Sequence, residues 1–165
     1  GICGRKTQTI KVSRRYRRKN NIISVICGKK TAISGKQKTI MTENDISYKI
    51  RGAIFNVYNV LGPGLLESVY VAALVFELKK EGLKAIREVP VPVYYENEIL
   101  EIGFRLDLLV ENKVIIEVKS VENLAPVHHK QVLTYLKLTE LKLAILVNFN
   151  VDNIKSGIFR KVNGL

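Results

Sequence analysis

Two apolar, strand-like runs in the stretch Arg105–Ser120, RLDLLVENKVIIEVKS, carry Asp107, Glu117 and Lys119, whose types and spacing could do chemistry. Asp107 interrupts a run of leucines, while Glu117 and Lys119 follow a run of valine and isoleucine. Burying an ionised side chain is costly unless another group compensates its charge. The three charges therefore either lie at the surface or form a site that holds a cation.

The turn between the two strands of this stretch decides whether Asp107 and Glu117 meet. Side chains alternate between the faces of a strand, so Glu117 and Lys119 share a face. A two-residue turn places Asp107 and Glu117 on opposite faces of the sheet. A three-residue turn, Glu111-Asn112-Lys113, sets them directly across from each other, with Cβ atoms ~5 Å apart.

In the second arrangement two carboxylates face each other beside an ammonium group. Like charges directly opposite destabilise a sheet, so this arrangement makes sense around a divalent cation. Oxygen ligands without cysteine or a coordinating histidine select Mg²⁺ or Mn²⁺. Such an ion beside Lys119 suits the attack of water on a phosphodiester. The alternative is an exposed hairpin on which Glu117 and Lys119 form a surface pair.

The surrounding sequence predicts the elements that position this hairpin. Apolar residues at helical spacing indicate two helices, over residues 43–62 and 65–82, joined by a turn at Gly62–Gly64. Residues 84–100 indicate a strand that is either at an edge of the sheet or irregular, because of Pro90 and Pro92. The further predictions are the two hairpin strands (102–110 and 114–121), a helix (125–139), a buried strand (141–149) and a weak final strand or turn (153–165). The order ααβββαβ is typical of a mixed α/β sandwich.

Asp107, followed ten residues later by Glu-x-Lys on a hairpin, resembles the signature of the PD-(D/E)XK nuclease superfamily, with Leu106 in place of its proline. More narrowly, GLLESVY (Gly64–Tyr70) is similar to the pattern that names the GxxExxY family, and the likeness extends from about Asp45 to Val162. The resemblance implies a restriction-endonuclease-like core, a mixed β-sheet flanked by helices, with the site at the hairpin. It also implies hydrolysis of DNA, or less commonly RNA, by metal-activated water.

The resemblance also implies roles for residues outside the hairpin. Glu67 would be the helix-borne acid of the superfamily, a metal ligand or water-orienting group, although a first-turn glutamate is favoured at any helix N-terminus. Gln131 and Tyr135 resemble a Q-x-x-x-Y motif and share a helix face. The expected catalytic residues are Glu67, Asp107, Glu117, Lys119, Gln131 and Tyr135, and the expected metal ligands are Asp107, Glu117 and Glu67.

Two further side chains are candidates for contact with nucleic acid. Arg105 shares the Asp107 face of its strand and either contacts phosphate or pairs with a carboxylate. His128 and His129 are adjacent on a predicted helix, so they cannot both point to one site. Surface or capping roles are favoured for both histidines, and His128 is the candidate for a phosphate contact.

The net charge of +12 is confined to the beginning of the chain. Residues 1–40 contain seven lysines, five arginines and no acidic residue, whereas residues 41–165 carry 15 basic and 15 acidic residues. We expect a nuclease-like domain at 41–165 behind a basic arm. The arm is either a disordered tail that attracts phosphate backbones or not part of the working protein, since Met41 is the only methionine. We favour the second interpretation. A targeting segment is excluded because the apolar run IISVIC is too short.

The cysteines and the length of the apolar runs indicate the expected cellular location and partners of the protein. Cys3 and Cys27 fit no zinc or redox spacing, and no run approaches the ~18 apolar residues of a membrane span. We therefore expect a cytoplasmic protein that acts on nucleic acid, DNA before RNA, without a membrane partner. The alternatives are a nuclease-like fold that binds nucleic acid or protein without cutting, and a small RNA-binding protein that depends on residues 1–40.

Overall fold

The computed structural model describes residues 41–96 and 98–165. Helices α2 (Glu43–Leu61) and α3 (Glu67–Lys80) lead into strands β1 (Ala85–Tyr95), β2 (Glu98–Val110) and β3 (Val114–Lys119). They are followed by α4 (Pro126–Thr139), β4 (Leu143–Asn148), the short α5 (Ile154–Gly157) and β5 (Ile158–Val162). The predicted α/β class and the order ααβββαβ are confirmed, and α5 and β5 form the tail that the sequence left open.

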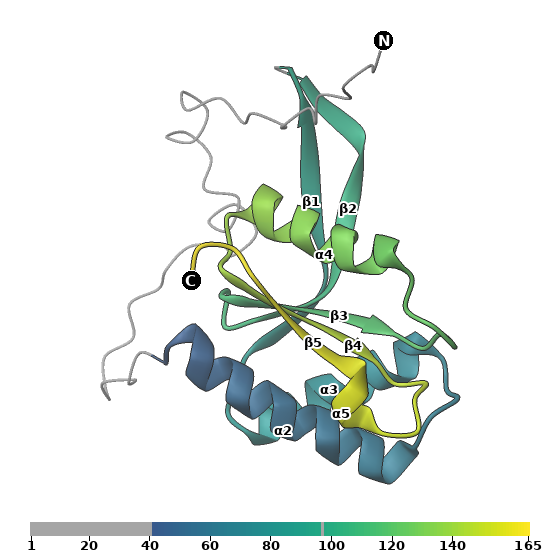
Figure 1. The fold of residues 1–165 in the computed structure, drawn as a ribbon. Coiled ribbons are helices and arrows are strands. Elements are labelled where there is room, and N and C mark those ends of the chain that lie inside the picture. The colour runs from purple at the N-terminus through teal and green to yellow at the C-terminus, as the bar shows by residue number, and fades with distance from the viewer. Residues whose placement is uncertain (1–40, 97) are drawn as a thin grey trace, which may run out of the picture.

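Within the described residues, five strands form one mixed sheet in the order β1-β2-β3-β4-β5, with β3 and β4 parallel and the other neighbours antiparallel. The edge position of β1 was expected from Pro90 and Pro92, because proline has no backbone N–H to donate to a ladder. The predicted strand over 84–100 is wrong at its end. Glu96, with a φ of 55°, turns the chain before β2 begins. β1 and β2 form a long hairpin that extends past α4 (Figure 1).

The sheet separates two apolar layers, with α2 and α3 on one face and α4 on the other (Figure 1). Alternate residues of β3 belong to different layers. Val114, Ile116 and Val118 pack in the α2–α3 layer, whereas Ile115 packs in the α4 layer. Glu117 shares the parity of Ile115, so its side chain lies on the α4 face of the sheet.

Helix α2 begins at a capping box made by Thr42 and Asp45. Oγ1 of Thr42 accepts a hydrogen bond from the backbone N–H of Asp45 (3.2 Å), and Oδ2 of Asp45 accepts one from the N–H of Thr42 (2.9 Å). Such caps stabilise a helix by about 1 kcal/mol. None of the helices in residues 41–96 and 98–165 combines the length and apolarity needed to cross a membrane.

Candidate active site

A three-residue turn, Glu111–Lys113, joins β2 to β3 and sets the register at the site. Leu108 pairs with Ile116, which is the register that a three-residue turn requires. At Asp107 the alternation of β2 breaks, because Leu106 and Leu109 both pack in the α4 layer while Leu108 packs in the α2–α3 layer. The side chain of Asp107 reaches the backbone of β3, and its charge acts on Glu117. The three-residue turn, one of the two options that the sequence left open, is therefore present, whereas a shared face for Asp107 and Glu117 stays a prediction.

The turn itself is unusual for its residue types. Glu111 and Asn112 both have left-handed backbone conformations, with φ of 51° and 56°. Asparagine tolerates this region well, whereas glutamate does so at a cost. Lys84 anchors Glu111 twice: its carbonyl accepts from the Glu111 N–H (2.8 Å), and its own N–H donates to Oε1 of Glu111 (2.7 Å). These contacts hold the turn, and so the register, in place.

The carboxylate of Asp107 is hydrogen-bonded to the backbone of β3. Its Oδ2 accepts a hydrogen bond from the N–H of Val118 (2.8 Å), which fixes the carboxylate beside β3. Burial raises the pKa of Asp107, and the charges of Glu67 and Glu88 add to this effect. The Val118 hydrogen bond and the ammonium of Lys119 act in the opposite direction but do not outweigh burial.

Glu117 is the most deeply buried acid of the site, with 2% of its surface exposed. Its Oε1 accepts a hydrogen bond from Nζ of Lys119 (2.8 Å). Its Oε2 is buried and has no hydrogen-bond partner in the described part of the chain. Burial, and then the charge of Asp107, raises the pKa of Glu117 to about 7. A carboxylate in this position needs a proton or a cation to be stable at neutral pH.

Lys119 is held in place at the end of β3. Its Nζ also donates to the carbonyl of Val118 (3.2 Å), in addition to its ion pair with Glu117. Burial alone would lower the pKa of this lysine, but the hydrogen bond to Glu117 and the charges of Glu117, Glu67 and Asp107 raise it above its ordinary value. The side chain is therefore a fixed positive charge at neutral pH.

Helix α3 brings Glu67 to the carboxyl end of β3. Oε1 of Glu67 accepts from the N–H of Ser120 (3.2 Å), and the hydroxyl of Ser120 donates to the carbonyl of Leu65 (2.6 Å). The turn before α3 is tied by Tyr70, whose hydroxyl donates to the carbonyl of Gly62 (2.7 Å) and accepts from the N–H of Leu65 (3.1 Å). The turn, the helix start and β3 are thus joined around Glu67.

The oxygen donors of this site fit a hard divalent cation. Asp107 and Glu117 offer carboxylate oxygens alone, and Oε2 of Glu117 is a buried acceptor with no protein donor among the described residues. Glu67 is near enough to act on both of their pKa values. It does not complete a ready-made ligand set, since no three Asp, Glu, His or Cys side chains are grouped for metal binding within the described ranges. Mg²⁺ sites of this type commonly rest on one or two carboxylates, with water and phosphate oxygens completing the shell.

Gln131 and Tyr135 lie together on the face of α4 that covers the site. Nε2 of Gln131 donates a hydrogen bond to the hydroxyl of Tyr135, as their spacing on one helix face allows. Burial, and then the charge of Glu117, raises the pKa of Tyr135. Its ring packs edge-on against Phe104 of β2, with centroids 5.4 Å apart. Both residues therefore belong to the surroundings of Glu117.

The two predicted nucleic-acid contacts, Arg105 and His128, lie on β2 and in the first turn of α4. Arg105 is exposed on β2 opposite Pro90, and no ion pair joins it to a carboxylate among the described residues. Nδ1 of His128 accepts from the N–H of Ala125 (3.2 Å), which is the capping role favoured by the sequence. Phosphate contact by either residue stays a prediction.

Glu88 on β1 is the neighbour of the site that sequence reasoning missed. The β1–β2 pairs on either side of it, Arg87 with Leu108 and Val89 with Leu106, set Glu88 across from Asp107. Its φ of 51° is rare for a glutamate, and its charge contributes to the raised pKa of Asp107. The three acids Glu88, Asp107 and Glu117 therefore follow one another across three strands.

Comparison with known proteins identifies the family. A family model described as the PD-(D/E)XK nuclease superfamily matches residues 44–161, which is most of the chain. The chain therefore belongs to the PD-(D/E)XK nuclease superfamily, and the restriction-endonuclease-like fold is confirmed. Nucleases of this superfamily generally use divalent metal ions.

The chain is also similar to a solved structure. The crystal structure of SSO0001 is similar to the chain, with 21% sequence identity and a TM-score of 0.47, over 80% of this chain and 71% of that one. A search of curated proteins found no match.

Proposed function

We propose that this protein is a nuclease that requires Mg²⁺ or Mn²⁺ and hydrolyses phosphodiester bonds of DNA, with RNA as the less favoured substrate. The observation that carries the proposal is the buried Oε2 of Glu117, which has no partner in the described residues although Lys119 pairs with Oε1 and the charge of Asp107 acts on the same carboxyl group. If Glu117 served only in a structural ion pair, Lys119 would suffice as its partner. A second carboxylate opposite Glu117 adds repulsion that a bound cation relieves.

In this proposal Asp107 and Glu117 hold the ion, and Glu67 is a further ligand or orients water. When bound, the ion lowers the pKa of a water molecule and stabilises charge on the phosphate. Lys119 contributes a fixed ammonium that donates to the charge developing on the phosphate oxygens. Gln131 and Tyr135 position the site from α4 and separate Glu117 from solvent. Arg105 and His128 contact the phosphate backbone of the nucleic acid beside the site.

We further propose membership of the GxxExxY family within the superfamily. The three residues that define its pattern each have a local task that supports this assignment. Gly64 has a φ of 92°, a conformation that residues with a side chain rarely adopt. Oε1 of Glu67 accepts a hydrogen bond from the Ser120 N–H. The hydroxyl of Tyr70 is hydrogen-bonded to Gly62 and Leu65, in the turn between α2 and α3. The pattern thus describes how the turn presents Glu67 to β3.

Cleavage assays test the proposal. Wild type, Asp107→Asn and Asp152→Asn are incubated with single- and double-stranded DNA and with RNA, in Mg²⁺, Mn²⁺ or EDTA. Asp152 is exposed in the loop after β4, so its substitution is the matched control. We expect cleavage of DNA that requires the metal, survives Asp152→Asn and is lost in Asp107→Asn. Cleavage that continues in EDTA or in Asp107→Asn contradicts the proposal. Binding without cleavage by wild type supports the alternative, a nuclease-like fold that only binds.

A further inference from the structure

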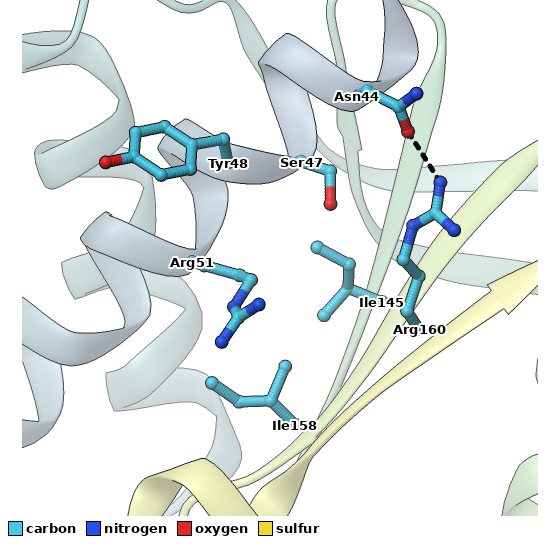
Figure 2. Close-up of a pocket in the computed structure, with 7 residues that line it drawn as sticks. All are labelled: Asn44, Ser47, Tyr48, Arg51, Ile145, Ile158 and Arg160. Carbon is cyan, nitrogen blue, oxygen red and sulfur yellow. Dashed lines mark hydrogen bonds between the residues drawn. The ribbon is translucent and has the colours of Figure 1, made fainter.

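A second concave site lies on the opposite face of the sheet from the three charged residues of the hairpin. This pocket, of about 250 Å³, is formed between α2 and the strands β4 and β5, and its lining residues are Asn44, Ser47, Tyr48, Arg51, Ile145, Ile158 and Arg160 (Figure 2). Ile145 packs in the α2–α3 layer, whereas Leu146, which pairs with Glu117 across β3 and β4, packs in the α4 layer. The pocket is therefore separate from the candidate active site.

The lining of the pocket is positively charged and contains no acidic residue. Arg160 reaches in from β5, and its Nη2 donates to Oδ1 of Asn44 (2.6 Å), which orients the guanidinium (Figure 2). Arg51 reaches in from α2, and no hydrogen bond or ion pair joins it to any residue that the structure describes. Of the acids at the start of α2, Asp45 is engaged by Thr42, whose hydrogen bonds lower its pKa.

A neutral donor lies between the two arginines. Ser47 is only 6% exposed, its hydroxyl points toward the space between Arg51 and Arg160 (Figure 2), and no hydrogen bond occupies it within residues 41–96 and 98–165. Two guanidinium groups and a hydroxyl are donors that match the oxygens of a phosphate. The rim carries Tyr48, which is 82% exposed and available for stacking with a planar ring.

We propose that this pocket binds one nucleotide, with its phosphate between Arg51 and Arg160 and its base against Tyr48. At about 250 Å³ the pocket lies just below the roughly 300–1,000 Å³ of pockets that enclose a small ligand, so it holds the phosphate while the base lies outside, on the exposed Tyr48. The nucleotide is either free or part of a nucleic-acid strand, since both present the same phosphate and base. The pocket is built from other residues than the hairpin, so the inference stands or falls independently of nuclease activity.

Calorimetric titration of the full chain in EDTA, which prevents metal-dependent cleavage, tests the pocket. The probes are adenosine 5′-monophosphate, inorganic phosphate, adenosine and a short single-stranded oligonucleotide with or without a 5′-phosphate. The proteins are wild type, Arg51→Gln, Arg160→Gln, Tyr48→Ala and Lys137→Gln. Lys137 is exposed on α4, so its substitution removes the same charge far from the pocket. Each substituted side chain is exposed, and thermal melts verify folding.

We expect Arg51→Gln and Arg160→Gln each to weaken nucleotide binding about tenfold or more, as for loss of a charge-assisted hydrogen bond. Lys137→Gln should change it less than about twofold, because it removes only diffuse attraction. Adenosine should bind far more weakly than its monophosphate. Tyr48→Ala should weaken the nucleotide and leave inorganic phosphate unchanged.

Two results overturn the inference. One is equal weakening by Arg51→Gln and Lys137→Gln, which means that phosphate binds by net charge alone. The other is equal binding of adenosine and its monophosphate. If the oligonucleotide binds with the same dependence on Arg51 but the mononucleotide does not bind, the pocket stands and its ligand is a nucleic-acid strand.

Discussion

Replacing Glu117 with glutamine should remove a pH-dependent loss of stability from the metal-free protein. Burial and the charge of Asp107 raise the pKa of Glu117 from its ordinary 4.5 to about 7. A carboxyl group with a raised pKa binds its proton more tightly in the folded state, so unfolding releases it. The stability that the proton provides is fully present below pH 4.5 and is lost as the pH rises through about 7.

The size of this effect follows from the difference in pKa. Each tenfold change in proton affinity is worth about 1.4 kcal/mol, so the change from 4.5 to about 7 is worth about 3 kcal/mol in total. Most of this loss in the free energy of unfolding, roughly 2 to 3 kcal/mol, should fall between pH 5 and 8. His129, whose pKa is lowered by burial, contributes a pH dependence of the opposite sign. Its contribution cancels in the difference between wild type and Glu117→Gln.

Urea denaturation in EDTA at pH 5, 6, 7 and 8 measures this difference. Glu122→Gln is the control, because Glu122 is exposed in the loop after β3. As the pH rises, we expect the free energy of unfolding of wild type and of Glu122→Gln to fall in parallel. It should fall by more than that of Glu117→Gln. Parallel curves for wild type and Glu117→Gln would refute the argument, because they would mean that Glu117 is not desolvated.

Three further predictions concern the turn, the lysine and the basic arm. Tyr70→Phe should lower the free energy of unfolding by about 1 kcal/mol, because the hydroxyl makes two hydrogen bonds to the turn before α3. Urea titration beside Tyr48→Phe, at an exposed ring, measures it, and equal losses would count against the role of the turn. Lys119→Ala should slow cleavage by about 100-fold or more while Mg²⁺ still raises the melting temperature. Loss of both effects would mean that Lys119 mainly organises the carboxylates. Deleting residues 1–40 should leave the melting temperature unchanged, since α2 has its own cap. A large fall in a thermal melt would mean that these residues pack on the domain.

The register of the β2–β3 hairpin could be predicted from the sequence because it rests on turn length. The sequence offered a two-residue and a three-residue turn, and the structure has the three-residue turn. Strict alternation along β2 was wrong at Asp107, where Leu106 and Leu109 both pack in the α4 layer. The edge position of β1 was predictable for the same kind of reason, since Pro90 and Pro92 lack backbone donors.

Features that join distant segments could not be predicted in this way. Glu88 meets Asp107 only through the register of the β1–β2 hairpin, and its left-handed backbone conformation is not favoured by its residue type. The hydrogen bond from Ser120 to Glu67 spans 53 positions, and the one from Arg160 to Asn44 spans 116. Both depend on how helices pack on the sheet, which spacing along one element does not encode.

Thermal melts with and without Mg²⁺ test most directly whether Asp107 and Glu117 hold a divalent cation. Mg²⁺ should raise the melting temperature of wild type and Asp152→Asn, by the equivalent of about 2.7 kcal/mol at 100 times the dissociation constant. It should leave Asp107→Asn unchanged. Without metal, Asp107→Asn should be at least as stable as wild type, because asparagine can still accept from the Val118 N–H while the repulsion of Glu117 is gone. An Asp107→Asn protein that is less stable without metal, together with a wild type that does not respond to Mg²⁺, would contradict the metal site.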